Sequence, residues 1–344
     1  MPPEAPLRLR LDEAALVENW RALDRLSGTA RAGAAVKADG YGLGARRVAA
    51  ALSAAGCADF FVAHFAEADA VLDLLAPASL AVLHGPLNPA DAAYAKAKGI
   101  RPVLNSLAQA RLWRDLGGGP CDLMVDTGMN RLGIALAELG DDLLRGLPVE
   151  TLHSHLASAE EDSPLNTQQR NRWEATRRAV PHRRASLANS AGIMLGAAYH
   201  GDLTRPGLSL YGGVPCAALK PHIRQVAWPE AALIQVRDIA AGDAVGYNAT
   251  FTAERAMRVG IVSLGYADGY LRCWSGKGVM LHGAARLPVL GRVSMDMTAV
   301  DLSEAPDLRE GDWVTADYDL PAAAATSGLS QYELLTLLGR RFVR

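Results

Sequence analysis

Polar side chains that could do chemistry stand at the ends of short apolar runs in this sequence. Lys37 follows the run Ala34, Ala35 and Val36 and is followed by three glycines within AVKADGYGLGA. A strongly hydrated ammonium group is costly to desolvate at such a position unless it has a function. The sequence therefore predicts a functional lysine where a short buried strand meets a tight turn.

Other polar groups close later apolar runs in the same way. They come from DTGMNRLG, HSH, an Asn-Ser pair and an Arg-Pro-Gly segment, and they are Arg131, His155, Asn189, Ser190, Arg205 and Gly207. Arginine binds carboxylate and phosphate through paired hydrogen bonds, and serine with free backbone amides cradles phosphate. Taken singly, each residue is more often an ordinary salt-bridge or hydrogen-bond partner. Taken together, they indicate a site for an anionic cofactor and a carboxylate substrate.

Eight apolar runs, separated by segments of helical periodicity, must position these groups. The runs span 34–39, 59–64, 80–85, 100–105, 121–127, 150–155, 183–189 and 202–212. Short buried strands that alternate with helices predict an α/β fold with a parallel sheet, and eight such units predict a closed (β/α)8 TIM-like barrel. Its catalytic groups would lie at the carboxyl ends of the strands. An open doubly wound sheet is the alternative, weakened by the lack of GxGxxG after the first strand.

The pattern changes after residue 226, where short apolar runs are separated by Gly, Asp and Pro. This change predicts two domains, a barrel over residues 1–226 and a C-terminal mostly-β domain over residues 227–344. The last segment, SQYELLTLLGRR, has helical periodicity, and the AAAATSG stretch before it is interpreted as a flexible connection.

Composition limits the classes of partner. The chain has 344 residues, 50% of them hydrophobic, and a formal charge of -2 from 35 basic and 37 acidic residues that are well mixed. The sequence has no basic stripe of the kind that would indicate nucleic acid or membrane binding, so a small molecule is the expected partner. The four cysteines lie far apart, and no His, Cys and Asp residues are spaced as metal ligands, so no metal is expected. The charged N-terminal segment and the lack of a membrane-length apolar run predict a cytoplasmic protein.

A family resemblance covers essentially the whole chain. The segments AVKADGYG, DTGMNRLG, HSHLASAE, ANSAG, TRPGLSLYG, VGYNATFTA, LGYADGY and GRVSMDM resemble, in order and spacing, the motifs of alanine racemases. Those enzymes use pyridoxal 5'-phosphate (PLP) and combine an N-terminal barrel with a C-terminal β-domain. The resemblance implies interconversion of L-alanine and D-alanine, either to supply D-alanine for peptidoglycan or to degrade it.

The resemblance implies a role for each polar group of the barrel. Lys37 would hold PLP covalently and act as the base on one face of Cα. The phosphate would bind Tyr41, Ser190 and the backbone amides around Gly207 and Leu208. His155, Asn189 and Arg205 complete the implied cofactor-binding set. Arg205 would face the pyridine nitrogen, to which an arginine cannot give a proton, so that the ring stays a weak electron sink and transamination is disfavoured.

The second base implied by the resemblance is Tyr247, which would reach the site from a partner subunit in a head-to-tail homodimer. A hydrogen-bonded chain from Tyr247 through His155 to Arg205 would make this phenol a better base. Arg131 would hold the cofactor ring oxygen and the substrate carboxylate, helped by the backbone amide of Met295. The resemblance also implies an entrance lined by Tyr266 and Asp296.

Two departures from the family pattern stand out. Met124 occupies a position, two residues before the aspartate of DTGMNRLG, where many family members carry a lysine, often carbamylated, that supports the arginine of this motif. We therefore predict no carbamylated lysine near Arg131, which a bound anion, a carboxylate or an amide must orient instead. Ser186 stands where a histidine often precedes ANSA.

Three other functions stay open from the sequence. A racemase of another amino acid such as serine would use the same scaffold, because pocket loops set specificity. A related amino-acid decarboxylase would pair the pyridine nitrogen with a carboxylate, whereas this chain offers Arg205. A PLP-carrier protein would lack the second domain, which holds Tyr247.

Overall fold

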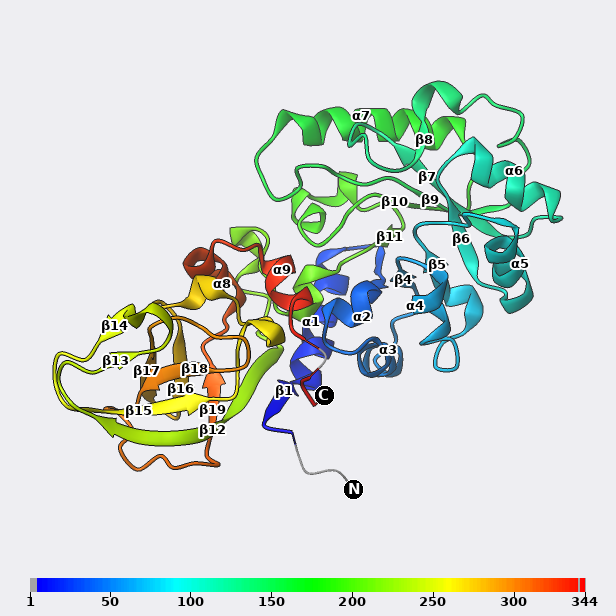
Figure 1. Cartoon of the computed structure of the whole chain (residues 1–344). Coiled ribbons are helices and arrows are strands. Elements are labelled where there is room, and N and C mark those ends of the chain that lie inside the picture. The colour runs from blue at the N-terminus through cyan, green and yellow to red at the C-terminus, as the bar shows by residue number, and fades with distance from the viewer. Residues whose placement is uncertain (1–4, 340, 344) are drawn as a thin grey trace. The chain divides into compact units, whose positions relative to one another are not determined.

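The computed structural model describes residues 5–339 and 341–343, which form two compact units (Figure 1). One unit spans Glu13–Arg224, and the other joins residues 5–12 to the described residues from 225 onward. The sequence-based division placed residues 1–12 with the barrel. In the structure, strand β1 (Leu7–Leu11) pairs antiparallel with β12 (Ala227–Ile239), because its three leucines alternate with arginines and so have one face to bury in the second unit.

The first unit is built on the eight predicted strand runs. Seven of them are hydrogen-bonded in parallel, in the order β3 (Ala34–Ala35), β4 (Phe60–Val62), β5 (Leu80–Val82), β6 (Arg101–Leu104), β7 (Cys121–Asp126), β9 (Val149–His153) and β10 (Arg184–Ser186). The short strand β8 (Ile134–Ala135) adds to β7. Most strand residues are buried, which explains why apolar residues predominate in the strands.

The eighth run closes the barrel. Strand β11 (Leu203–Thr204) pairs in parallel with β2 (Arg31–Ala32), which continues into β3. On its other side, the backbone N–H of Asp202 donates to the carbonyl of Ala185 in β10 at 2.8 Å. Backbone hydrogen bonding therefore continues from β10 through β11 to β2 and β3, which confirms the predicted closed parallel barrel rather than an open sheet.

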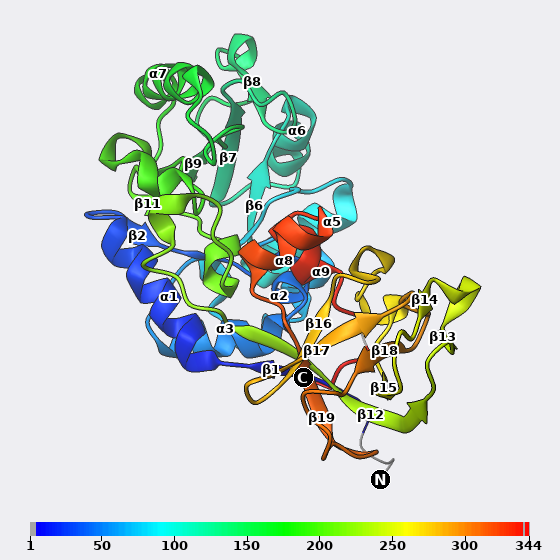
Figure 2. The same ribbon diagram turned by 90° about the vertical axis from the view of Figure 1, so that its left-hand side faces the viewer.

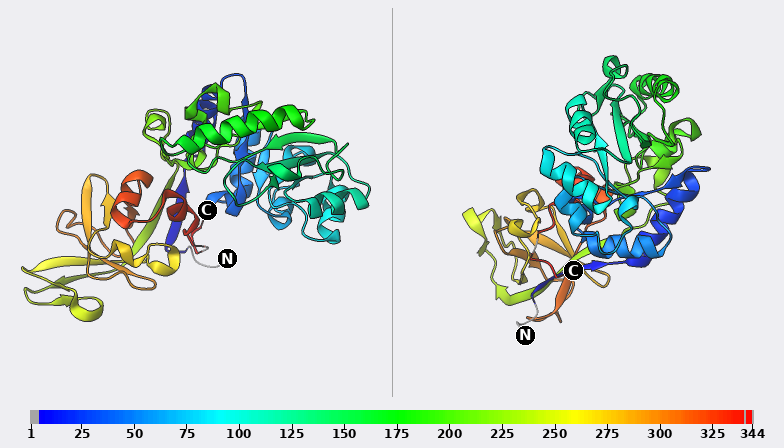
Figure 3. Two further views of the ribbon diagram at one scale, coloured as in Figure 1. Left: turned by 90° about the horizontal axis from the view of Figure 1, so that it is seen from above. Right: turned by 90° about the vertical axis from the view of Figure 1, so that its right-hand side faces the viewer.

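Helices alternate with these strands along the chain (Figures 1 and 3). They are α1 (Glu13–Leu26), α2 (Lys37–Tyr41), α3 (Ala45–Ala54), α4 (Phe65–Asp69), α5 (Pro89–Lys98), α6 (Leu107–Asp115) and α7 (Pro164–Ala179). Asn88, Ser106 and Ser163 start α5, α6 and α7 by accepting hydrogen bonds from backbone N–H groups of the first turn. Trp113 of α6 and Trp173 of α7 are buried against the strands, so these helices form a hydrophobic layer with the barrel.

The second unit is a closed antiparallel barrel (Figure 2). Its strands follow the order β1, β12, β15 (Met257–Val262), β18 (Thr298–Asp301), β17 (Ala285–Leu290), β16 (Val279–His282) and β19 (Trp313–Ala316), and β19 pairs back to β12. A hairpin of β13 (Ala244–Val245) and β14 (Phe251–Thr252) extends from it. The mostly-β prediction is confirmed.

Two helices follow the last strand of this unit, α8 (Leu320–Ser327) and α9 (Gln331–Thr336). The interpretation of AAAATSG as a flexible connection was wrong. Asp319 caps α8, a proline stands in the first turn, and alanine has the highest helix propensity of all residues. Among the described residues, no helix is long and apolar enough to cross a membrane.

Candidate active site

Lys37 lies where the first barrel strand ends, as predicted. It begins α2, in which Ala38, Asp39, Gly40 and Tyr41 all have positive φ angles, from 52° to 63°. Such a left-handed turn is unfavourable for L residues and persists only where neighbouring groups hold it. Here Glu67 accepts hydrogen bonds from the backbone N–H groups of Ala38 at 2.8 Å and Ala63 at 2.7 Å.

The environment of Lys37 favours its neutral amine. Burial lowers the pKa of Lys37, the positive charges of Arg131 and Arg205 lower it further, and Glu67 opposes them. A neutral amine is the form that attacks a carbonyl carbon and that accepts a proton. The lysine is therefore suited to both roles that the sequence suggests.

A cradle of hydroxyl and amide groups lies beside this turn. Ser190 Oγ accepts hydrogen bonds from the backbone N–H groups of Gly207 at 3.1 Å and Ser209 at 3.3 Å. A Cβ atom on Gly207 would overlap the hydroxyl of Tyr41 and lie 2.9 Å from its Cζ atom. The Tyr41 ring cannot easily move away, because it stacks on Tyr211 with 4.6 Å between ring centroids. Gly207 thus lets a phenol, a serine and backbone amides converge.

Two further residues that we expected at the cofactor have structural contacts. Asn189 Oδ1 accepts a hydrogen bond from the backbone N–H of Gly192 at 2.9 Å, so this side chain shapes the turn after Ser190. Leu208 is buried and begins the short helix Leu208–Tyr211. Their expected contribution to cofactor binding stays a prediction.

Arg205 is a buried cation with 7% of its surface exposed. Its Nη2 donates to the carbonyl of Ser154 at 2.5 Å, and its Nη1 donates to Ser186 Oγ and to His153 Nδ1, the latter at 3.3 Å. Burial lowers the pKa of Arg205 to about 10, and the charge of Asp122 partly opposes this change. The guanidinium therefore stays charged at neutral pH.

Sequence analysis missed two residues of this network, Asp122 and His153. They lie inside the runs CDLMVDT and ETLHSH and are completely buried. His153, rather than the expected His155, is the histidine that hydrogen-bonds Arg205 in the structure. His155 lies near enough to be affected, since burial and the charges of Arg205, Arg131 and Lys37 lower the pKa of His155 to about 3. The signal in the sequence was Asp122, an acidic residue inside a run that is expected to be buried, because a buried acid requires a partner.

The loop that carries Arg131 is organised by Asp126. This carboxylate accepts hydrogen bonds from the backbone N–H groups of Gly128, Met129 and Arg131 at 2.7 to 3.0 Å. Burial opposes ionisation of Asp126, but the backbone hydrogen bonds outweigh it and lower its pKa. Among the described residues, none hydrogen-bonds the Arg131 guanidinium, which leaves this group available to an anion.

The remaining predicted residues belong to the second unit. Tyr247 lies between β13 and β14 with 63% of its surface exposed, and Met295 is 54% exposed. The loops of these residues adjoin through backbone contacts. A Cβ atom on Gly291 would lie 2.7 Å from the carbonyl of Val245, and the N–H of Ala267 donates to the carbonyl of Met295 at 2.9 Å.

The two expected entrance residues belong to these same loops. Tyr266 begins a single helical turn, and its backbone N–H donates to the carbonyl of Ser294 at 3.0 Å. Asp296 accepts a hydrogen bond from Arg341 Nη1 at 2.7 Å. Tyr247, Met295 and both entrance residues thus come from one set of loops.

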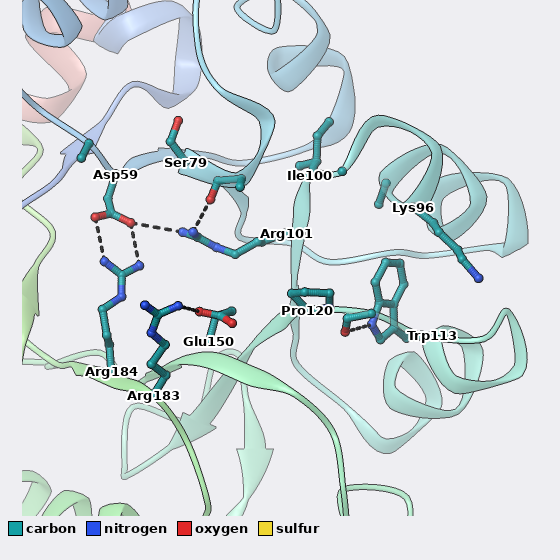
Figure 4. A pocket seen from close by; sticks show the side chains of 16 residues that line it. Asp59, Ser79, Lys96, Ile100, Arg101, Trp113, Pro120, Glu150, Arg183 and Arg184 are labelled. Atoms are coloured by element: carbon teal, nitrogen blue, oxygen red, sulfur yellow. Dashed lines mark hydrogen bonds and ion pairs between the residues drawn. The ribbon is translucent and has the colours of Figure 1, made fainter.

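A cavity of about 640 Å³ opens at the opposite, amino-terminal ends of the barrel strands (Figure 4). In its wall, Asp59 accepts hydrogen bonds from Arg184 at 2.7 and 2.9 Å and from Arg101 Nη2 at 3.3 Å. Glu150 pairs with Arg183 at 3.3 Å. These side chains pair with one another, and in barrels this face contributes to stability rather than to catalysis. Within the described part of the chain, no three His, Cys, Asp or Glu residues gather as a metal site.

Comparisons with known proteins give one consistent family. The family models for the N-terminal and C-terminal domains of alanine racemase match residues 11–215 and 226–344. A relative from Agrobacterium fabrum named "Alanine racemase, biosynthetic" is 40% identical, with 99% of this chain and 94% of the relative covered. A relative from Mesorhizobium japonicum named "Alanine racemase, catabolic" is 42% identical, with 98% and 92% covered.

A solved structure agrees with these relatives. The alanine racemase of Bartonella henselae, described with covalently bound pyridoxal phosphate, superposes with a TM-score of 0.89 at 34% identity, and 99% of each chain is covered. Both domains of the family are thus matched, in the family's order and over nearly the full length of this chain. The chain belongs to the alanine racemase family.

Proposed function

We propose that this protein is a PLP-dependent racemase that interconverts L-alanine and D-alanine. The observation that carries the proposal is the position of Lys37. It has a lowered pKa and lies in a strained turn at the carboxyl end of a barrel strand, beside the Ser190 hydroxyl and backbone amides that suit a phosphate. Membership of the alanine racemase family and a relative described with covalently bound pyridoxal phosphate support the same activity.

The residues of the barrel fit this cofactor. Lys37 would hold it. Ser190, Tyr41 and the backbone amides from Gly207 onward would bind its phosphate, and a residue larger than glycine at 207 would collide with Tyr41. Arg205 would donate a hydrogen bond to the ring nitrogen. When bound, PLP withdraws electron density from the amino acid and acidifies the hydrogen on Cα.

The chain's own residues then decide where the proton goes. Lys37 would remove or return the proton on one face of Cα, and Tyr247 would do so on the other. The Arg205 guanidinium does not release a proton to the ring nitrogen at neutral pH, so the ring would stay a weak electron sink. The proton taken from Cα would therefore be returned to Cα. Arg131, with the Met295 amide, would orient the substrate carboxylate, and Tyr266 and Asp296 would line the entrance.

We further propose a cytoplasmic head-to-tail homodimer in which Tyr247 serves the site of a second copy. The support is a group of exposed large side chains in the loops of the second unit, Tyr247, Met295 and Met297, with 63%, 54% and 43% of their surfaces exposed. Exposed apolar groups that gather in one region are typical of protein interfaces. The match of a second family model to residues 226–344 also disfavours a single-domain PLP carrier.

The experiment is to incubate the enzyme with pure L-alanine or pure D-alanine in deuterated water and to separate the products by chiral chromatography. The wild-type protein should give the racemate from either enantiomer, with deuterium on Cα. Lys37→Ala should abolish racemisation, and Tyr247→Phe should leave deuterium exchange from one enantiomer only, without inversion. A lack of exchange with alanine would refute the proposal, and faster inversion of serine would favour the other substrate.

A further inference from the structure

We propose that Asp122 and His153 are positioning residues for Arg205, which fix how its guanidinium is presented to the cofactor and thereby keep the enzyme a racemase rather than a transaminase. This inference rests on the proposed function, since it assigns Arg205 to the ring nitrogen. It concerns residues of the barrel interior that do not touch the substrate.

The hydrogen bonds define which nitrogen of His153 carries the proton. His153 Nε2 lies 3.1 Å from Asp122 Oδ2, and His153 Nδ1 lies 3.3 Å from Arg205 Nη1. An ionised carboxylate can only accept, and a guanidinium can only donate. His153 must therefore be neutral, with its proton on Nε2 and the lone pair of Nδ1 directed at Arg205.

Charged neighbours keep Asp122 in the form that this arrangement requires. Asp122 Oδ1 accepts a hydrogen bond from the backbone N–H of Thr151 at 3.0 Å and lies 3.4 Å from Arg101 Nε. Burial opposes ionisation of Asp122, but the charge of Arg101 and the bond from His153 outweigh it, and the pKa of Asp122 is lowered. Burial and the charges of Arg205 and Arg101 lower the pKa of His153 to about 4, so it is neutral at physiological pH.

The network leaves Arg205 one donor for the cofactor. Its two Nη atoms carry four N–H groups, and these face four protein acceptors: His153 Nδ1, Ser186 Oγ and the carbonyls of Ser154 and Leu187, the last at 3.5 Å. Only the Nε–H of the guanidinium then remains to point at a ring nitrogen. Without the acceptor on His153, the guanidinium could turn in its plane and that donor would move.

Arg205 Nη1 faces two side-chain acceptors. Ser186 supplies an oxygen, and His153 supplies the ring nitrogen Nδ1. Asp122 brings a compensating negative charge into a barrel interior that also holds the cation of Arg205. A buried cation with no such charge nearby is unstable and readily changes its protonation or its position.

A side reaction reports whether Arg205 is held correctly. If the ring nitrogen loses its hydrogen bond from Arg205 and takes a proton, electrons can pass onto the ring. The Cα of alanine is then oxidised to the ketone of pyruvate, water supplies the ketone oxygen, and the amino group with two electrons stays on the cofactor. The released pyruvate, divided by the number of racemisation events, measures this partition without depending on the overall rate.

The test compares the holoenzymes of the wild-type, Asp122→Asn, His153→Asn and His153→Phe proteins. Asp122→Asn keeps the shape but removes the charge that fixes the tautomer, and His153→Phe removes both hydrogen bonds. We expect the pyruvate ratio to rise about tenfold or more in both, which is the size of effect that follows the loss of a hydrogen bond to a charged group. His153→Asn retains an acceptor near the position of Nδ1 and should show a smaller rise.

Two further measurements separate positioning from a structural effect. Nitrogen NMR of histidine-labelled holoenzyme, recorded without substrate, should show a neutral Nε2–H histidine that does not titrate from mildly acidic to mildly alkaline pH and is absent from His153→Phe, which distinguishes it from His155. Asp122→Asn should remove that signal. Glu150→Gln is the matched control, because it breaks the pair with Arg183 at the other end of the barrel strands (Figure 4) without changing a partner of Arg101, and it should leave the pyruvate ratio unchanged.

An unchanged pyruvate ratio in both Asp122→Asn and His153→Phe, or an equal rise in Glu150→Gln, would overturn the proposal. A histidine signal that is the same in the wild-type and Asp122→Asn proteins would overturn its tautomer step. If Asp122→Asn does not fold, the two His153 variants still decide. A wild-type protein that does not racemise alanine would instead refute the proposed function, whereas the NMR measurement would still report on the pair.

Discussion

Gly207 shows how one missing side chain shapes the site. Its backbone has φ -130° and ψ -85°, outside the regions that L residues favour. Alanine would also meet a steric penalty, because the new Cβ atom would overlap the Tyr41 hydroxyl, and Tyr41 is held by its stack on Tyr211. Overpacking of this kind costs about 1–3 kcal/mol. We expect Gly207→Ala to weaken PLP binding about tenfold or more, measured as cofactor retained on dialysis and trapped by borohydride.

The hydroxyl of Tyr41 provides the control for this prediction. Tyr41→Phe removes the atom that the Cβ would overlap, so the double variant Gly207→Ala with Tyr41→Phe should bind PLP better than Gly207→Ala alone. If the two substitutions simply add their losses, the clash is not the cause. Burial raises the pKa of Tyr41 to about 12, so its hydroxyl acts as a donor at every working pH.

Residues of the site could be predicted where the sequence also predicted the end of the strand that carries them. Lys37, Arg131, Ser190 and Arg205 each follow a barrel strand, and the barrel places such positions on one face. The histidine that bonds Arg205 was not predictable. His153 and His155 are two residues apart at the end of one strand, a spacing that directs both side chains to the same side. Only the position of Asp122, on a different strand, distinguishes them.

Strands β7 and β9 carry the polar pair through the barrel interior, and this has a consequence for acid stability. The pKa of His153 is lowered from 6.5 to about 4 in the folded protein. As the pH falls below 6.5, the unfolded chain binds a proton on this histidine that the folded chain does not bind. The contribution of neutral His153 to the free energy of unfolding is therefore complete above pH 6.5 and is lost between pH 6.5 and 4. The difference corresponds to about 3 kcal/mol.

Urea unfolding at a series of pH values checks this expectation. His153→Phe should be less stable than the wild-type protein at neutral pH, but its free energy of unfolding should fall less steeply between pH 6.5 and 4. His155 contributes in the same sense and is unchanged in the variant, so the difference between the two curves isolates His153. Parallel curves would show that His153 titrates normally in the folded chain.

Whole elements were predictable where local pattern and tertiary structure agree. Each predicted run contains a barrel strand, with β9 beginning one residue early at Val149, because strands buried on both faces are rich in apolar residues. Two features were missed, for different reasons. Strand β1 pairs with β12, more than 200 residues later, and Glu230 of β12 bonds Arg8 at 2.6 Å and Arg10 at 2.8 Å. Helix α8 was missed because a run of alanines has no periodicity.

At the scale of the molecule, the proposed bases stand in different units. Lys37 belongs to the parallel barrel, and Tyr247 belongs to the second unit, where it is largely exposed. A site completed by a second copy makes a prediction that a self-contained site does not. When one chain carries Lys37→Ala and its partner carries Tyr247→Phe, one of the two shared sites contains both defects and the other contains none.

Mixing the two inactive variants therefore tests the shared site directly. Random pairing makes half of the dimers mixed, and each mixed dimer has one intact site of two, so activity should recover to about a quarter of the wild-type value. The control mixes Lys37→Ala with the double variant Lys37→Ala and Tyr247→Phe, which can form no intact site and should stay inactive. Mixed dimers, verified by mass, that recover no activity would mean that Tyr247 serves its own chain. Recovery can arise only if Tyr247 crosses between subunits, because in a self-contained site every mixed dimer keeps one defect in each half.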